Sequence, residues 1–242
     1  LMDHVSCCQF FSVPSETGRG AAQQSDPSST LSGAGSFFLP FGNAPEVCAG
    51  RPFLRGYGIW GAINRFDPPW WLKRNPDRRL GFLIGHGEVL SDIRNQVCLS
   101  ERCDPLNVPM PHISCRWRAN ENAMVRDMQD TIEDCINVAG SVTISLADQL
   151  HLPLVKPLVG KALAAQEDAP PPGYYIHEVG GAAMGASEEH SVVDRWNRLW
   201  RCPNVLVVDG ACWPSSGWQS PTLTMMAITR RACQAAVTPG ID

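Results

Sequence analysis

A change of hydrophobic period before residue 120 is the feature of the sequence that most constrains its fold. Ahead of it, short segments rich in aromatic and β-branched residues are separated by glycine and proline, which is typical of strands with one covered face. These segments are SFFLPF at 36–41, GYGIWGAINRF at 56–66, RLGFLIGHGEVL at 79–90, NQVCLS at 95–100 and PHISCRW at 111–117. The economical interpretation is an antiparallel sheet.

From Asn120 to Ala139 the apolar residues recur every three or four positions instead. This spacing predicts an amphipathic helix that lies across the sheet, with Asn120 as its N-terminal cap. Further on, AAQEDAPPPGYY at 164–175 contains three consecutive prolines followed by glycine. Such a composition stops helices, so we expect a domain boundary near residue 170.

The last part of the chain predicts a strand, a loop and a helix. NVLVVDGA at 204–211 is an apolar strand ending in Asp209 and Gly210, as strands buried on both faces of a parallel sheet do. In the following QSPTLTMMAITRRACQAAV, Ser220 suits a helix cap and Pro221 the first helical position. The start of this helix would attract a group that is anionic or becomes so.

Composition excludes several classes of function. The 242 residues are 44% hydrophobic and carry a formal net charge of −4, with acidic and basic residues interspersed. Nucleic acid is therefore not an expected partner, because no basic stripe could follow a phosphate backbone. No apolar run is long enough to span a bilayer. The polar segment 18–35 predicts a mobile loop.

The ten cysteines predict packing rather than chemistry. No Cys-x-x-Cys pair occurs, so neither a zinc nor a haem site is indicated and no metal is expected. Within apolar patterns lie Cys98, Cys115, Cys135 and Cys233, where a reduced thiol behaves as a small buried hydrophobe.

His177 opens the glycine-rich stretch HEVGGAAMG and is the strongest candidate for chemistry. An imidazole titrates near neutral pH, and the glycines at 180, 181 and 185 would let a flat ligand approach the backbone. If His177 lies near the helix start at 220–223, a proton acceptor meets a stabiliser of negative charge. That pairing suits removal of a proton while electrons go elsewhere.

Several motifs together resemble one family. HEVGGAAMG at 177–185, SVVD at 191–194, PNVLVVDGACWPS at 203–215 and QSPTLTMMAITRRA at 219–232 resemble the C-terminal block of the glucose-methanol-choline (GMC) family of FAD-dependent oxidoreductases. LMDH at 1–4, FLRGYGIWG at 53–61 and CDPLNVPMPHISCRWRANENAMVRDM at 103–128 are similar to its branch of gluconate, sorbitol and glucoside dehydrogenase large subunits.

The resemblance implies an α+β fold in two parts. Residues 1–170 would form an antiparallel-sheet substrate domain with helices on one face, and 171–242 the strand–helix part of an FAD-binding α/β domain. The activity implied is oxidation of a CH–OH group of an alcohol or sugar. His177 would take the hydroxyl proton while hydride passes to FAD.

The cofactor contacts implied by the resemblance come from two segments. Asp209 and Gly210 would approach the ribityl and phosphate region, while Pro221, Thr222 and Leu223 would face the flavin ring. The branch also implies a small subunit and a cytochrome electron acceptor as partners. His4, in LMDH, would lie near the flavin.

This sequence departs from the family pattern in three ways. Ser220 stands where the family has a catalytic Asn or His, so a catalytic role and a helix cap both stay open for it. Ala183 replaces an arginine. No G-x-G-x-x-G dinucleotide motif occurs, so we expect the N-terminal Rossmann part to be missing and FAD to be held weakly by this chain alone.

The missing motif keeps a second class of function open. The alternative is a flavin-free remnant that acts as a binding protein or a redox-neutral catalyst. Periplasmic and cytoplasmic locations both stay open as well. Of the other candidates, His112 is interpreted as a packed or hydrogen-bonded structural histidine, and His86 as a histidine without a special role. Trp70 and Trp71 are interpreted as core or partner contacts or as a stacking surface for a sugar.

Overall fold

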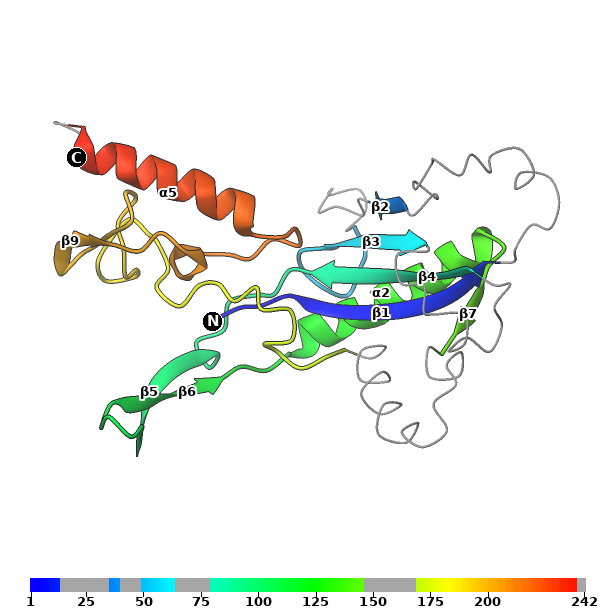
Figure 1. The fold of residues 1–242 in the computed structure, drawn as a ribbon, viewed down its shortest axis with the longest axis horizontal. Coiled ribbons are helices and arrows are strands. Elements are labelled where there is room, and N and C mark those ends of the chain that lie inside the picture. The colour runs from blue at the N-terminus through cyan, green and yellow to red at the C-terminus, as the bar shows by residue number, and fades with distance from the viewer. Residues whose placement is uncertain (14–34, 40–48, 64–78, 146–168, 239–242) are drawn as a thin grey trace, which may run out of the picture.

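The computed structural model describes residues 1–13, 35–39, 49–63, 79–145 and 169–238 (Figure 1). Its centre is a five-stranded sheet in the order β2-β3-β4-β1-β7, and every neighbouring pair is antiparallel, as predicted. The strands are β1 (Val5–Val13), β2 (Gly35–Leu39), β3 (Tyr57–Ile63), β4 (Arg79–Gly87) and β7 (Val142–Ile144). The predicted loop at 18–35, apart from Gly35, and the Trp70–Trp71 pair lie outside the described residues.

β1 and β7 are strands that no sequence pattern predicted. β1 nevertheless pairs with β4 along its whole length, from Val5 opposite Gly87 to Val13 opposite Arg79. Its sequence, VSCCQFFSV, contains adjacent cysteines and a glutamine in place of an alternating apolar pattern. Pairing on both edges, with β4 and β7, holds this segment extended in spite of its composition.

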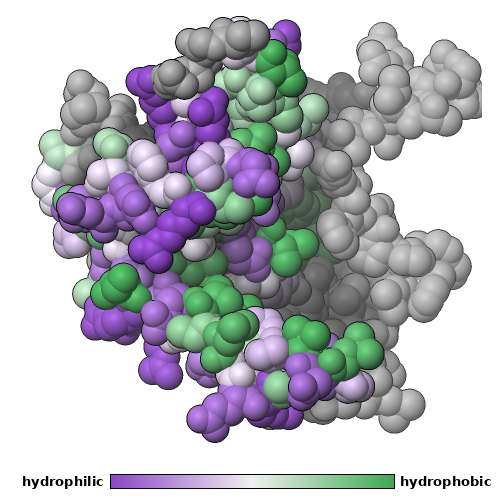
Figure 2. Space-filling model, turned by 90° about the vertical axis from the view of Figure 1, so that its left-hand side faces the viewer, coloured by the Kyte–Doolittle hydropathy of each residue, from purple (hydrophilic) through white to green (hydrophobic). Residues whose placement is uncertain are grey.

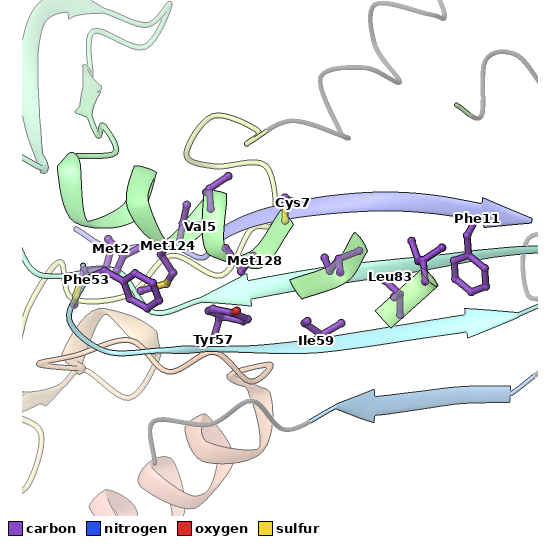
Figure 3. Close-up of a cluster of buried hydrophobic side chains, with 14 of the residues drawn as sticks. Met2, Val5, Cys7, Phe11, Phe53, Tyr57, Ile59, Leu83, Met124 and Met128 are labelled. Atoms are coloured by element: carbon purple, nitrogen blue, oxygen red, sulfur yellow. The ribbon is translucent and has the colours of Figure 1, made fainter. Parts of the chain in front are cut away.

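The predicted helix is α2 (Ala119–Val138), and it packs across one face of the sheet (Figure 1). Its inward side chains form the core with residues of β1, β3 and β4, as Figure 3 shows around Met124 and Met128. A Cβ atom on Gly85 would lie 2.7 Å from the Met128 sulfur, and one on Gly87 would collide with that of Met124. Two glycines of β4 therefore let the helix approach the sheet closely.

The predicted cap of α2 is wrong by two residues. The helix begins after Arg118, whose backbone N–H donates to the side chain of Glu121 at 2.9 Å. Asn120 instead accepts a hydrogen bond from the backbone N–H of Leu54 at 2.8 Å. The amide is drawn away from the helix end because it fixes the loop that leads into β3.

β5 (Gln96–Cys103) and β6 (Pro109–Ser114) form a separate two-stranded hairpin that projects from the sheet (Figure 1). Hydrophobic side chains gather in the lower part of the face drawn in Figure 2, at the height of this hairpin in Figure 1. Leu99 and Ile113 are 76% and 62% exposed. His112 is exposed as well, so of its two interpretations the packed one is wrong.

The cysteine prediction is partly wrong. Cys98 and Cys233 are exposed, and Cys115 and Cys135 are half-buried, because the hairpin and the outer faces of the helices are open to solvent. Among the cysteines that the structure describes, Cys7, Cys8 and Cys212 are buried. Burial raises the pKa of the Cys7 thiol to about 12, which makes it an unreactive packing group. No disulfide joins cysteines of the described ranges.

The C-terminal part contains β8 (Arg198–Leu199), β9 (Cys202–Leu206), the short 3₁₀ helix η2 (Gly210–Cys212) and α5 (Thr222–Val237). The strand buried on both faces of a parallel sheet is not found here. β9 pairs antiparallel with β8, and Val205 is 40% exposed, because β8 is its sole neighbour in this two-stranded sheet. α5 begins one residue later than predicted, with Pro221 just before it.

Within the part of the chain that the structure describes, neither helix is apolar enough over a sufficient length to cross a membrane.

Candidate functional site

His177 lies beside the N-terminus of the chain. The backbones of Met2 and Val179 exchange two hydrogen bonds of 2.9 Å, which place residues 1–4 along residues 177–180. As a result, the Nδ1 atoms of His4 and His177 are 3.4 Å apart, and their ring centroids are 4.9 Å apart with the rings nearly perpendicular. His177 is half-buried, whereas His4 is 4% exposed.

A buried carboxylate fixes both histidine segments. Asp3 is 1% exposed, and its Oδ1 accepts the backbone N–H groups of His4 at 2.7 Å and His177 at 3.3 Å. Its Oδ2 accepts the backbone N–H of Gly173 at 2.7 Å. Three backbone donors thus replace the water lost when this charge is buried. The separation of the two histidines is therefore set by main-chain atoms.

His86 adds a third imidazole to this cluster. On β4 it stands opposite Ser6 of β1 and Gly58 of β3, on the sheet face away from α2. Its ring centroid is 5.1 Å from that of His4 and 4.5 Å from that of Tyr175. His86 is 6% exposed, and its Nε2 is buried without a hydrogen-bond partner.

Burial keeps two of these imidazoles neutral. It is the main cause that lowers the pKa of His4 to about 4, with a further contribution from His177 that Asp3 and the Gly217 backbone partly oppose. Burial likewise lowers the pKa of His86 to about 3, together with His4 and His177. At neutral pH, His177 therefore has uncharged imidazoles behind it.

The loop at 213–220 covers the same face of the sheet. The Trp218 ring lies directly against Gly58, where an added Cβ would collide with it. The Ser216 hydroxyl accepts from the N–H of Val89 at 3.0 Å and contacts the Val89 carbonyl at 3.3 Å. The Gly217 backbone lies against the His4 ring and raises the pKa of His4, as a hydrogen-bond acceptor does. This loop, the sheet and the N-terminus thus form one unit.

A pocket of about 460 Å³ adjoins the loop. Its lining includes Arg55, Glu88, Trp213, Ser220, Pro221 and Arg231. Ser220 is exposed at its rim, and His177 is not among the residues that line it. Within the described ranges, no hydrogen bond joins the side chains of His177 and Ser220, the two predicted catalytic residues.

The glycine-rich turn after His177 does meet the Asp209–Gly210 segment. Gly180 donates its N–H to the Gly210 carbonyl at 3.0 Å, and Ala182 does the same to Ala211 at 2.7 Å. A Cβ on Gly210 would lie 3.0 Å from the Glu178 carbonyl, so this contact needs glycine. The exposed Asp209 accepts the N–H of Ala211 at 2.9 Å.

The first turn of α5 is open to solvent. Thr222 is exposed and Leu223 is 79% exposed, so their backbone N–H groups lie at an accessible helix N-terminus. Farther along, the Thr229 hydroxyl donates to the Val208 carbonyl at 3.1 Å and holds α5 against the segment that leads to Asp209. Gly210 also lies against the Met225 side chain of α5, so the helix and the Asp209–Gly210 segment pack on each other.

Two site residues were undervalued by sequence reasoning. His86 was interpreted as a histidine without a special role, and His4 carried only the LMDH motif as a signal. No local pattern could have paired His4 with His177, because 173 residues separate them. In the described part of the chain, no group of three or more His, Cys, Asp or Glu side chains is arranged to hold a metal ion.

Comparison with known proteins agrees with the motifs. The profile of the family described as GMC oxidoreductase matches residues 91–229. The 2-methyl-1,2-propanediol dehydrogenase of Mycolicibacterium austroafricanum is 41% identical over 198 residues, which cover 79% of this chain and 32% of that protein. The fructose dehydrogenase large subunit of Gluconobacter japonicus is 27% identical over 168 residues, covering 68% and 26% of the two chains.

Among solved structures, pyridoxine 4-oxidase from Mesorbium loti aligns over 75% of this chain and 34% of its own, with a TM-score of 0.45 and 16% identity. The chain spans about a third of the length of the propanediol dehydrogenase that it matches.

Proposed function

The chain belongs to the GMC oxidoreductase family. We propose that it is the part of an FAD-dependent enzyme that carries the proton acceptor, and that this enzyme oxidises a CH–OH group of an alcohol or sugar. Members of the family are flavoproteins, and the similar proteins are named as dehydrogenases and oxidases. The observation that carries the proposal is the half-buried His177, held by main-chain contacts at the edge of a cluster of neutral imidazoles.

His177 is proposed as the group that accepts the substrate's hydroxyl proton. It is half-buried, whereas His4 and His86 lie deeper and have strongly lowered pKa values. A general base should be positioned rigidly and have a pKa near the operating pH. Of the three imidazoles, His177 is the one that a ligand outside the core could reach.

FAD is proposed as the resident cofactor, and the residues present fit it. The exposed first turn of α5 offers backbone N–H groups at Thr222 and Leu223 beside the buried Pro221, which suit the electron-rich edge of a flavin ring. Asp209 offers its carboxylate, and Gly210 a backbone without a side chain. When bound, FAD would supply the acceptor for hydride.

The sheet face away from α2 is proposed to bind the substrate. Trp60 of β3 and Tyr175 flank His86 there, with ring centroids 6.4 Å and 4.5 Å from its own, and Trp218 packs on Gly58 nearby. Aromatic rings suit the apolar faces of sugars and small alcohols. The relatives named for a diol and for fructose support this substrate class.

Ser220 is proposed to contact the substrate or the cofactor from the rim of the 460 Å³ pocket. Its hydroxyl can donate or accept a hydrogen bond but cannot act as a base at neutral pH. Ser220→Ala should therefore raise KM or lower kcat about tenfold or less. A small subunit as partner draws support from the name of the fructose dehydrogenase large subunit.

The decisive test is His177→Ala in the native protein, with turnover of diols and sugars measured beside the flavin content. General-base catalysis contributes about 10²- to 10⁴-fold, so turnover should fall by that factor while bound flavin is unchanged. His190→Ala is the matched control, because His190 is exposed in a turn. Full turnover in His177→Ala would refute the assignment, and a native protein without flavin would favour a flavin-free function.

A further inference from the structure

We propose that His4 is a positioning residue that holds His177 in the tautomer with a proton on Nδ1 and a lone pair on Nε2. The geometry behind it is the 3.4 Å contact between the two Nδ1 atoms, together with the Gly217 backbone on the His4 ring. Only the catalytic consequence rests on the proposed function of His177. The tautomer itself is a property of this chain.

The assignment follows from counting protons on the two rings. A neutral imidazole has one N–H and one lone pair, and a backbone carbonyl can only accept. The Gly217 backbone raises the pKa of His4, which is the effect of an accepting carbonyl, so the His4 ring directs its N–H there and its other nitrogen keeps a lone pair. Since Nδ1 of His4 faces His177, that lone pair is on Nδ1 and Nε2 carries the hydrogen.

Two lone pairs cannot form a hydrogen bond, so the proton between the rings belongs to His177. Its Nδ1–H donates to Nδ1 of His4, and its Nε2 is left with the lone pair that a base needs. The reverse arrangement would put a second N–H of His4 toward His177, which requires a charged His4. Burial opposes that charge and lowers the pKa of His4 to about 4.

The surroundings of His4 keep this arrangement fixed. From its own segment, Asp3 uses both carboxylate oxygens on backbone N–H groups, including that of His4. From β4, His86 packs on the ring with its own pKa lowered, and from the segment before His177, Tyr175 packs on His86. The charged or titratable groups that act on His4 are His177 and Asp3, and neither is a Lys or Arg cation.

For catalysis, the consequence is a base that is ready before the substrate arrives. Nε2 of His177 accepts the hydroxyl proton, and Nδ1–H continues to donate to His4 as the ring becomes positive. The neutral His4 can stabilise that charge as an acceptor without adding one of its own. A His177 with the proton on Nε2 would first have to change tautomer.

The test compares His4→Asn and His4→Gln in the native protein, because each variant keeps a polar group near one of the two ring nitrogens of His4. Asparagine places a carbonyl oxygen near the position of Nδ1, whereas glutamine places its amide near that of Nε2. Histidine with ¹⁵N-labelled rings gives two-bond proton–nitrogen correlations that distinguish the tautomers, and the His177 signal is identified by its loss in His177→Gln. Melting temperatures confirm that each variant is folded.

We expect His177 to carry its proton on Nδ1 in the wild type and in His4→Asn, and to populate both tautomers in His4→Gln. Turnover should be at least about tenfold higher in His4→Asn than in His4→Gln, which corresponds to about 1.4 kcal/mol in the barrier. A wild-type His177 protonated on Nε2, or an unchanged tautomer in His4→Gln, would overturn the proposal.

The two hypotheses fail separately. If His177→Ala retains turnover while the wild type shows the Nδ1–H tautomer, the catalytic role is lost and the positioning by His4 stands. If His177→Ala is inactive and the Nε2–H tautomer is found, His177 is the base and His4 does not position it.

Discussion

Replacing Asp3 with asparagine should destabilise the protein far more than a change of one atom suggests. The Asp3 carboxylate is almost fully buried and accepts the backbone N–H groups of His4, Gly173 and His177 at 2.7, 2.7 and 3.3 Å. Hydrogen bonds to a charged acceptor contribute about 1.5–3 kcal/mol each, against about 1 kcal/mol for neutral ones. The third of these bonds is long, so we place it at the lower end.

In Asp3→Asn, one oxygen becomes an NH₂ group that faces a backbone donor. At least one hydrogen bond is then lost and the others become neutral, while the cost of burying a charge is removed. The net loss is about 2–4 kcal/mol in the free energy of unfolding. Urea unfolding followed by tryptophan fluorescence measures it.

Asp104→Asn provides the matched control. Asp104 Oδ1 also accepts two backbone N–H groups, from Leu106 and Val108 at 2.9 Å each, but within an exposed hairpin turn where water can replace them. It should cost less than about 1 kcal/mol. If the two variants lose equal stability, the buried carboxylate does not fix the histidine segments.

Two further predictions concern the same face of the sheet. Burial lowers the pKa of His4 to about 4 and of His86 to about 3, so between pH 6.5 and these values the unfolded chain binds protons that the folded one excludes. The free energy of unfolding should fall as the pH drops through this window, by about 3 kcal/mol for His4 and by about 5 kcal/mol for His86 once the pH lies below both pKa values. His86→Leu removes the larger contribution, so its stability should fall less steeply with decreasing pH; a pH slope identical to that of the wild type would contradict this prediction. Gly58→Ala places a Cβ inside the Trp218 ring and should lower the free energy of unfolding by about 1–3 kcal/mol. Gly181→Ala is the control, because no atom lies within 4 Å of its Cβ, and it should leave the stability unchanged. Thermal melts of both variants measure the difference, and equal melting temperatures would contradict the prediction.

Local patterns predicted the elements that depend on local physics. The apolar spacing of α2 and the branched, aromatic runs of β3 and β4 each gave the correct element because the burial that stabilises them follows that period. β1 was missed because its pairing partners, not its composition, hold it extended. The neighbours of β9 were misjudged because an apolar run does not reveal how many strands lie beside it.

The site was harder to predict because its geometry is made by distant segments. The glycine context indicated His177 as a candidate, and the apolar run before them indicated Asp209 and Gly210. The structure joins the two segments through backbone hydrogen bonds. His4 approaches His177 only because Met2 pairs with Val179. That pairing leaves no periodicity in the sequence.

The stretch Gly85-His86-Gly87 shows how one strand serves both the core and the site. Side chains alternate between the faces of a strand, so Gly85 and Gly87 face α2, where the methionines of the helix fill the space of their absent side chains. His86 must then point to the opposite face, toward His4 and Tyr175. The position of β4 in the sheet thus determines both the close packing of α2 on one face and the place of the His86 imidazole on the other. A one-residue shift of β4 would remove both at once.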